Sequence, residues 1–169
     1  MLGNVRAMNQ VTLQEITADT VRSVISLEVS PDQSVYVAPN AVSIAEAHFN
    51  PGAWIKAICA DKVPVGFVML FDPAIPGAIA RGPVARDAVG LWRLMIDHRY
   101  QRRGFGKKAL DLVCGHIRRT TDATTLLSSY VPGPDGPERF YLGYGFSRTG
   151  QLRNDGHEIE IILKLGHSD

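Results

Sequence analysis

The residues best suited to chemistry are two glycines set among basic side chains. Gly104 and Gly106 follow Arg102 and Arg103 along the chain, and Lys107 comes directly after them. A helix N-terminus has unpaired backbone N–H groups and a partial positive charge, which together bind phosphate. Glycine lacks a Cβ, so a phosphate oxygen can approach its amide closely. If a helix begins here, the loop is suited to a pyrophosphate.

The flanking residues predict the strand and the helix that such a loop requires. Residues 91–96 form a β-prone run, and apolar residues recur at helical spacing between positions 107 and 119. This spacing places the apolar side chains on one stripe of a helix. The helix is therefore expected to begin near Gly104, directly after the strand and the loop.

A glycine pair after a strand is common, and several kinds of loop contain one. The simplest alternative is a tight strand-to-helix turn beside a solvated basic patch. A Walker P-loop is excluded because the pattern G-x-x-x-x-G-K-[ST] does not occur in the chain. A Rossmann fingerprint would need a third glycine near position 109, which is Ala109.

A specific resemblance covers this loop and a second segment. Residues 101–106, QRRGFG, match (Q/R)-x-x-G-x-(G/A), which is motif A of the GNAT superfamily of acyl-coenzyme A N-acyltransferases. Residues 139–146, RFYLGYGF, are similar to the F-Y-x-x-x-G-F signature that follows the fifth strand in many members. The second segment follows the Gly104 loop at the distance that the family layout requires. The chain thus resembles a GNAT enzyme over nearly its whole length, from about Val11 to Leu165.

The resemblance implies a fold of the α/β (α+β) class in a single domain, residues 11–166, with 1–10 and 167–169 as loose termini. The GNAT fold has a central mixed, mostly antiparallel sheet of about six to seven strands, splayed between strands 4 and 5 and flanked by about four helices. Local patterns agree, because they predict strands at 11–16, 53–60, 63–71, 125–131 and 157–165, and helices after residue 19 and at 41–49 and 138–142.

The resemblance also implies acetyl-CoA (coenzyme A) as cosubstrate and a direct transfer without an enzyme nucleophile. Tyr141 matches the tyrosine that faces the coenzyme A sulfur in the family, where a phenol can protonate the leaving thiolate as general acid. Backbone groups of Leu94 and Ile96 are expected to bind the pantetheine. The implied cofactor-binding residues are Leu94, Met95, Ile96, Gln101, Arg102, Arg103, Gly104, Phe105, Gly106 and Lys107.

The general base is left open by the sequence. The acceptor amine must lose a proton before it attacks, so a base is expected, reached directly or through water. Glu28, Glu46, His48 and Asp97 are candidates by residue type alone. Each of them is more often a surface or capping group, and the spacing does not choose among them.

Several remaining side chains are expected to be structural. The cysteines Cys59 and Cys114 form no C-x-x-C pair and the histidines are scattered, so neither a disulfide nor a metal site is expected. Both thiols are interpreted as packed groups. Phe140 and Phe146 are expected to lie in the core.

The acceptor is less well defined. Residues 30–33, 37–40, 43–47, 93–97, 100–101 and 156–160 resemble the corresponding parts of bacterial spermine/spermidine (diamine) N-acetyltransferases. Glu28 and Glu46 could bind a polycationic acceptor, although they could equally well solvate helix faces. Aminoglycosides, amino acids and protein N-termini stay open as other acceptors. A non-catalytic CoA-binding module is the alternative outside the enzyme class.

The composition argues against several other classes of function. The chain has 169 residues, of which 45% are hydrophobic and 21% charged, with a formal net charge of +1. These values are ordinary for one globular domain and create no overall field that would attract nucleic acid or an anionic membrane. No apolar run resembles a signal peptide or a membrane span, so cytoplasmic residence is expected. The resemblance adds the expectation of a homodimer.

Overall fold

The structure, a computed structural model, describes residues 10–80 and 87–166. Its elements in chain order are β1 (Val11–Gln14), α1 (Val21–Ile25), the 3₁₀ turn η1 (Pro31–Gln33), α2 (Asn40–His48), β2 (Ala53–Ala60), β3 (Val63–Phe71), β4 (Ala88–Ile96), α3 (Phe105–Thr120), β5 (Thr125–Tyr130), α4 (Glu138–Tyr144), β6 (Ser147–Arg153) and β7 (Glu158–Lys164). The termini predicted to be loose are residues 1–10 and 167–169, of which 1–9 and 167–169 lie outside the described residues. Gln10 is described, and its backbone exchanges hydrogen bonds with Asp61.

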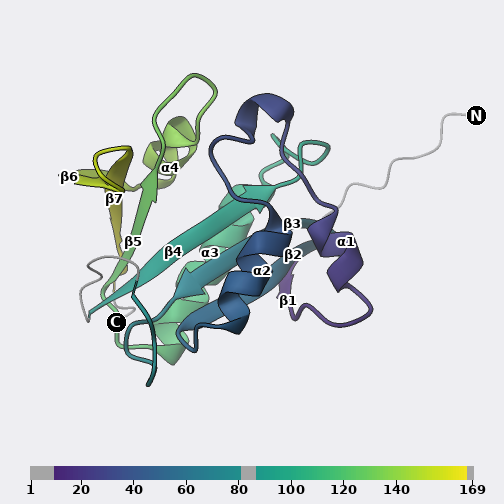
Figure 1. The fold of residues 1–169 in the computed structure, drawn as a ribbon, viewed down its shortest axis with the longest axis horizontal. Coiled ribbons are helices and arrows are strands. Elements are labelled where there is room, and N and C mark those ends of the chain that lie inside the picture. The colour runs from purple at the N-terminus through teal and green to yellow at the C-terminus, as the bar shows by residue number, and fades with distance from the viewer. Residues whose placement is uncertain (1–9, 81–86, 167–169) are drawn as a thin grey trace, which may run out of the picture.

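Seven strands form one sheet in the order β1-β2-β3-β4-β5-β7-β6. All neighbouring strands are antiparallel except β4 and β5, which are parallel. Helices α1 and α2 cover one face of the sheet, and α3 covers the other face (Figure 1). The predicted fold class, a mixed and mostly antiparallel sheet flanked by helices, is therefore confirmed.

Each face of the sheet has its own apolar core. The stripe predicted on α3 is buried, with Ala109, Leu110 and Val113 at 0% exposure, and it packs with β-strand residues and with Tyr141 and Phe146. A smaller cluster around Val24 and Phe67 lies under α1 and α2. Burial of a large apolar side chain contributes about 1.5–3 kcal/mol, so these two clusters hold the helices on the sheet. The sheet in turn fixes where β4 and α3 meet.

The parallel pair β4–β5 separates soon after it begins. Pairing runs only from Ala88 with Thr125 to Gly90 with Leu127. Where the two strands part, the Ser128 hydroxyl donates a hydrogen bond of 2.9 Å to a β4 carbonyl, that of the next residue after Gly90. Beyond this point β4 and β5 diverge, as predicted for strands 4 and 5.

A bulge in β4 accompanies this divergence. Against β3, Leu91 pairs with Leu70 and Arg93 pairs with Met69, which leaves Trp92 as the extra residue. A bulge of this kind bends the strand and increases its twist. Trp92 stacks on Phe71 of β3, with ring centroids 4.5 Å apart.

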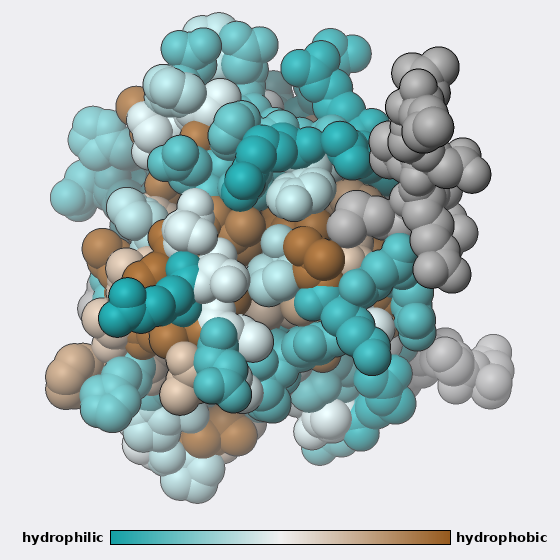
Figure 2. All heavy atoms as spheres, turned by 90° about the vertical axis from the view of Figure 1, so that its right-hand side faces the viewer, coloured by the Kyte–Doolittle hydropathy of each residue, from teal (hydrophilic) through white to brown (hydrophobic). Residues whose placement is uncertain are grey.

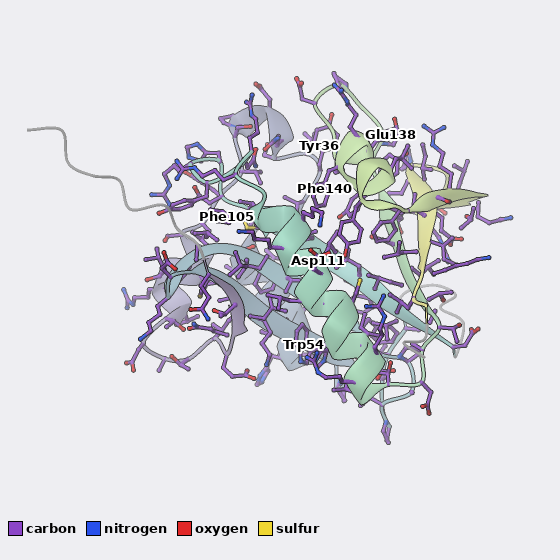
Figure 3. The ribbon with its side chains drawn as sticks, turned by 180° about the vertical axis from the view of Figure 1, so that it is seen from behind. Tyr36, Trp54, Phe105, Asp111, Glu138 and Phe140 are labelled. Atoms are coloured by element: carbon purple, nitrogen blue, oxygen red, sulfur yellow. The ribbon has the colours of Figure 1, made fainter. Side chains whose placement is uncertain are left out.

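The other tryptophan lies elsewhere in the molecule. Trp54 of β2 stacks on His116 of α3 with ring centroids 4.3 Å apart. Figure 3 shows Trp54 beside the C-terminal half of α3, far from Phe105 at the start of that helix.

Two predictions about structure were wrong. Strand β6, residues Ser147–Arg153, was not predicted, because it is a polar edge strand with mostly exposed residues and no apolar alternation. Phe140 is 37% exposed rather than buried, whereas Phe146 is buried as expected. The buried, unpaired cysteines agree with packed thiols.

The surface is polar with small apolar areas. Figure 2 shows hydrophilic side chains over most of the face at the α1 side, with hydrophobic groups between them. Scattered apolar exposure of this kind is normal for a surface in contact with water. Within residues 10–80 and 87–166, no helix has the length and apolar character needed to cross a membrane.

Candidate active site

A cleft of about 1160 Å³ opens where β4 and β5 diverge. The two strands form its floor with residues 90–96 and 127–131. Its walls come from four connections: residues 33–39 before α2, the glycine loop, residues 135–137 before α4, and the β6–β7 hairpin. Beyond Gly90, β4 has no strand partner on this side. The carbonyls of Leu91, Trp92 and Ile96 accept hydrogen bonds from side chains, and the backbone polar groups between Trp92 and Ile96 are the ones that a ligand could bind.

The glycine loop has the geometry of an anion site. Gly104 is the N-cap of α3 in the left-handed conformation, with φ of 79°, and a Cβ built there would meet nothing within 4 Å. Arg102 is also left-handed, with φ of 59°. Successive backbone N–H groups in such conformations form a concave site for an anion, and the helix dipole adds to it. The first turn of α3 contains no acidic residue.

Two loop residues have structural contacts that the sequence did not show. Gly106 lies under Phe140 of α4, whose ring would be 3.1 Å from a Cβ at that position. Phe105 is buried in the core, so only its backbone faces the loop. The second glycine therefore also allows α4 to approach α3.

The Gln101 side chain links three parts of the molecule. Its amide nitrogen donates to the Ile96 carbonyl at 2.9 Å and to Gln33 Oε1 at 2.8 Å. Through these two hydrogen bonds, the Gln101 amide joins the end of β4 to the segment before α2. Among the predicted cofactor-binding residues, those that line the cleft are Leu94, Met95, Ile96, Gln101, Arg102, Gly104, Phe105, Gly106 and Lys107, while Arg103 packs over the Tyr100 ring. Their role in binding stays a prediction.

Tyr141 lies in the cleft wall and is almost completely buried, at 7% exposure. Burial raises the pKa of Tyr141 to about 12, although a hydrogen bond with Ser128 acts in the opposite direction. Ser128 in turn is fixed by its bond to the Leu91 carbonyl. The phenol is thus held in position and fully protonated at neutral pH, the state that a general acid needs.

The structure separates the four residues considered as a base. Glu46 lines the cleft and forms an ion pair of 3.4 Å with Arg93. Glu28 and His48 are exposed and are not among the cleft-lining residues. Asp97 is completely buried, and its carboxylate accepts hydrogen bonds from Arg99 and from the Glu28 backbone. Asp97 is therefore a structural group.

The hydrogen bonds of Asp97 also decide its ionisation. Burial would raise the pKa of Asp97, yet the hydrogen bonds from Arg99 and from the Glu28 N–H, with the Arg99 charge, together lower it to about 2. The carboxylate is thus a permanent anion at neutral pH that fastens the segment after α1 to the end of β4.

Glu158 is a cleft-lining carboxylate that the sequence did not single out. It begins β7, accepts a hydrogen bond from the Ser129 hydroxyl of β5, and accepts another of 2.7 Å from Asn154. The β6–β7 hairpin brings it to the cleft, and that hairpin could not be predicted because β6 lacks a pattern. Glu46 and Glu158 thus approach the same space from α2 and from β7.

No metal site was found in the described part of the chain. No group of three or more His, Cys, Asp or Glu side chains is placed to hold an ion within residues 10–80 and 87–166. The polar groups that do converge are backbone amides, basic side chains, a phenol and carboxylates. Such a set suits a nucleotide-bearing thioester at one end of the cleft and an amine at the other.

Comparison with known families assigns the class. Residues 19–146 match the acetyltransferase (GNAT) family model. The chain belongs to this family and is an N-acetyltransferase, an enzyme of a family that uses acetyl-CoA.

Individual relatives are more distant. A spermine/spermidine N(1)-acetyltransferase from Bacillus subtilis (strain 168) is 26% identical over 158 residues, covering 89% of this chain and 97% of the relative. A probable spermine N(1)-acetyltransferase from Bacillus subtilis subsp. natto is 25% identical over the same shares.

Solved structures share the fold. The aminoglycoside acetyltransferase AAC(6')-Ib in complex with coenzyme A has a TM-score of 0.71 at 14% identity, covering 92% of this chain and 95% of the other. Ard1 from Thermoplasma volcanium has a TM-score of 0.67 at 17% identity, covering 92% and 98%. These identities are low, so the likeness is one of fold alone.

Proposed function

We propose that this N-acetyltransferase transfers the acetyl group of acetyl-CoA directly to a primary amine of a polyamine such as spermidine or spermine. The observation that carries the proposal is the cleft itself, whose lining includes both a phosphate-type loop and two carboxylates, Glu46 and Glu158. The relative that acts on spermine and spermidine, matched over 89% of this chain, supports the acceptor class. Other small amines, amino acids and protein N-termini are the competing acceptors.

The loop and β4 fit coenzyme A. The amides at the start of α3, with Arg102 and Lys107, would hold the pyrophosphate, and the open space over Gly104 leaves room for it. The backbone of Leu94 to Ile96 faces the gap between β4 and β5 and would bind the pantetheine amides, as a further strand would. The acetyl carbonyl would then lie near the point where the strands part.

Tyr141 supplies the proton for the leaving group. Its phenol is neutral at every pH at which the enzyme would be assayed, because its pKa is about 12. As the amine attacks the thioester carbonyl, Tyr141 donates its proton to the sulfur, and a β4 amide polarises the carbonyl oxygen. A CoA-binding module without turnover would not need an acid at this position.

Glu158 and Glu46 serve the acceptor. A carboxylate attracts the ammonium form of a polyamine and can take the proton that the attacking nitrogen must lose. Glu158 is the better base, because Glu46 already neutralises Arg93. The proposal also includes one functional domain, residues 11–166, supported by the single continuous sheet, and a cytoplasmic homodimer, for which the exposed edge strand β6 offers a surface.

The test measures free thiol release from acetyl-CoA with a panel of amines. The panel contains spermine, spermidine, a diamine, an aminoglycoside, amino acids and a short peptide. Turnover confined to polyamines and diamines is the expected result, whereas preferred turnover of the peptide or the aminoglycoside would contradict the polyamine proposal. Binding of acetyl-CoA without turnover on any amine would favour the binding module.

A further inference from the structure

A short segment before α2 crosses the opening between the diverging strands. We call residues 33–37 the strap. They line the cleft and are hydrogen-bonded to both of its sides. On the β4 side, Gln33 accepts the 2.8 Å hydrogen bond from Gln101. On the β5 side, the Tyr36 hydroxyl donates a 2.5 Å hydrogen bond to the Pro134 carbonyl, 98 residues away in sequence. The strap thus connects the two walls that β4 and β5 leave apart.

The Tyr36 end of the strap depends on glycine in the facing turn. A Cβ at Gly133 would overlap the Tyr36 hydroxyl and lie 3.2 Å from its ring, so any larger residue would displace the phenol. Gly136 also borders the ring, which would be 3.4 Å from a Cβ there. Figure 3 shows Tyr36 beside the start of α4, near Glu138 and Phe140. The two glycines of the turn therefore leave the space that the Tyr36 ring occupies.

The residues on either side of Tyr36 differ in burial, because Val37 packs against the cluster around Val24 and Phe67. Val35, the residue before Tyr36, is 69% exposed although it lines the cleft. On the hairpin side of the same cleft, Leu152 is 62% exposed. The exposed part of the lining therefore includes apolar side chains, and Glu46 and Glu158 line the same cavity. Apolar groups and carboxylates in one cleft suit a chain of methylene groups that carries cationic ends.

We propose that Tyr36 is a specificity-determining residue: its bridge to residues 133–136 narrows the opening of the cleft, so that unbranched alkyl amines enter and branched or ring-bearing amines are excluded. The inference rests on the proposed function and adds the shape of the acceptor to it. A steric barrier of this kind discriminates by repulsion against the wrong ligand rather than by attraction of the right one. Removal of the tyrosine ring should therefore broaden the acceptor range without loss of the slender acceptors.

The test uses binding as well as turnover. Two coenzyme A thioether conjugates serve as probes, one bearing a linear diamine chain and the other an aminoglycoside, and their dissociation constants are measured by calorimetry beside those of coenzyme A alone. The wild-type chain is expected to bind the linear conjugate at least about tenfold more tightly than the bulky one, the scale on which pocket shape discriminates. In Tyr36→Ala this ratio should fall to within about threefold, while the affinity for coenzyme A stays the same.

Two further variants and a control make the result specific. Tyr36→Phe keeps the ring but loses the bond to Pro134, so an intermediate ratio is expected. Gly133→Ala should displace the ring and resemble Tyr36→Ala, which keeps the test decisive if Tyr36→Ala folds poorly. Val42→Ala, on the exposed side of α2 and outside the cleft, should match the wild type.

The outcomes separate this inference from the proposed function. An unchanged conjugate ratio in Tyr36→Ala and Gly133→Ala, with normal spermidine turnover, would overturn the inference alone. Loss of coenzyme A affinity in these variants would also overturn it, because Tyr36 would then support the cofactor loop. A wild-type ratio that collapses in the variants, but without turnover of any polyamine, would leave the inference standing and refute the polyamine proposal.

Discussion

At the scale of single residues, the high pKa of Tyr141 predicts how the activity depends on pH. Burial places its pKa at about 12, above the ordinary value of 10, so the phenol keeps its proton across the working range. A general acid that stays protonated causes no alkaline loss of activity below that value. Any rise of activity with pH then reports the groups that must be deprotonated, the acceptor amine and its base.

Tyr141→Phe is expected to lower kcat by about 100-fold, the lower end of the range for a general acid. The KM for acetyl-CoA should change little, because the ring and its packing remain. The pH profile should keep its shape, since Tyr141 contributes no titration below about pH 12 in the wild type. A wild-type alkaline limb near pH 9 that disappears in the variant would contradict the pKa of about 12, whereas an unchanged kcat in the variant would contradict the role of general acid.

Glu158→Gln is expected to reduce kcat/KM for spermidine by about 10- to 100-fold and to leave the affinity for acetyl-CoA unchanged. The glutamine side chain can still bond to Ser129 and Asn154, so the loss would report the missing charge and base. Glu160→Gln is the comparison variant, because Glu160 is two residues further along β7 and bonds instead to Thr149 and Arg153. Equal losses in both variants would indicate a structural effect on the hairpin.

Part of the cleft lining could be predicted from the sequence. The glycine loop and Tyr141 belong to two short motifs that resemble those of the GNAT family, and both line the cleft, while their roles stay predictions. Glu158 and Tyr36 could not be predicted, because each reaches the cleft through contacts between distant segments, the hairpin in one case and the Pro134 turn in the other. Asp97 is the opposite case. Its residue type made it a candidate base, but its carboxylate is buried and bonded to Arg99, so its role is structural.

At the scale of elements, the start of α3 and the last turn of α4 contain two glycines with opposite requirements. Gly104 has φ of 79° and open space around it, so a side chain there is disfavoured by the backbone alone. Gly143 lies inside α4 with open space and without a positive φ, so alanine fits its conformation. An alanine substitution at Gly104 therefore measures backbone strain, and one at Gly143 measures helix propensity.

Gly104→Ala should lower the free energy of unfolding by about 1 kcal/mol or more and weaken acetyl-CoA binding, because the left-handed conformation is costly for alanine. Gly143→Ala should raise the free energy of unfolding by about 0.5–1 kcal/mol and leave acetyl-CoA binding unchanged. Urea denaturation and calorimetry measure the two quantities. Equal acetyl-CoA affinity in Gly104→Ala and wild type would argue against the loop as the pyrophosphate site.

The elements differ in how far the sequence predicts them. Helix α3 follows from apolar periodicity, which reflects burial against one core, and the β2–β3 hairpin follows from two β-rich runs joined by residues 61–62. Strand β6 has no such pattern, because it lies at the sheet edge and turns most of its residues to solvent. The bulge at Trp92 also leaves no local signal, since it depends on the register with β3.

At the scale of the whole molecule, Asp97 connects the first third of the chain to the sheet. It lies at the end of β4, and its carboxylate bonds to the backbone N–H of Glu28 while the His98 N–H bonds to the Glu28 carbonyl. The strap follows directly after this attachment. The position of the strap over the cleft thus depends on an ion that is completely buried.

Asp97→Asn is expected to lower the free energy of unfolding at pH 7 by about 1–2 kcal/mol, with allowance for the exposed Arg99 partner. The folded-state pKa, about 2, is below the ordinary 3.8, so this stabilisation is complete above about pH 4 and is lost as pH falls toward 2. Urea titrations across that range should show a shallower acid loss in the variant. Asp122→Asn, at an exposed position, is the control, and an equal change there would refute the role of Asp97.

The stacking of the two tryptophans gives the protein a built-in optical reporter. Trp92 lines the cleft and stacks on Phe71, whereas Trp54 stacks on His116 of α3. The chain has no other tryptophan. Emission should therefore change when an acceptor conjugate enters the cleft, and Trp92→Phe should abolish that change while Trp54→Phe preserves it. The bulge at Trp92 thus also places a fluorophore in the cleft where the acceptor is expected to bind.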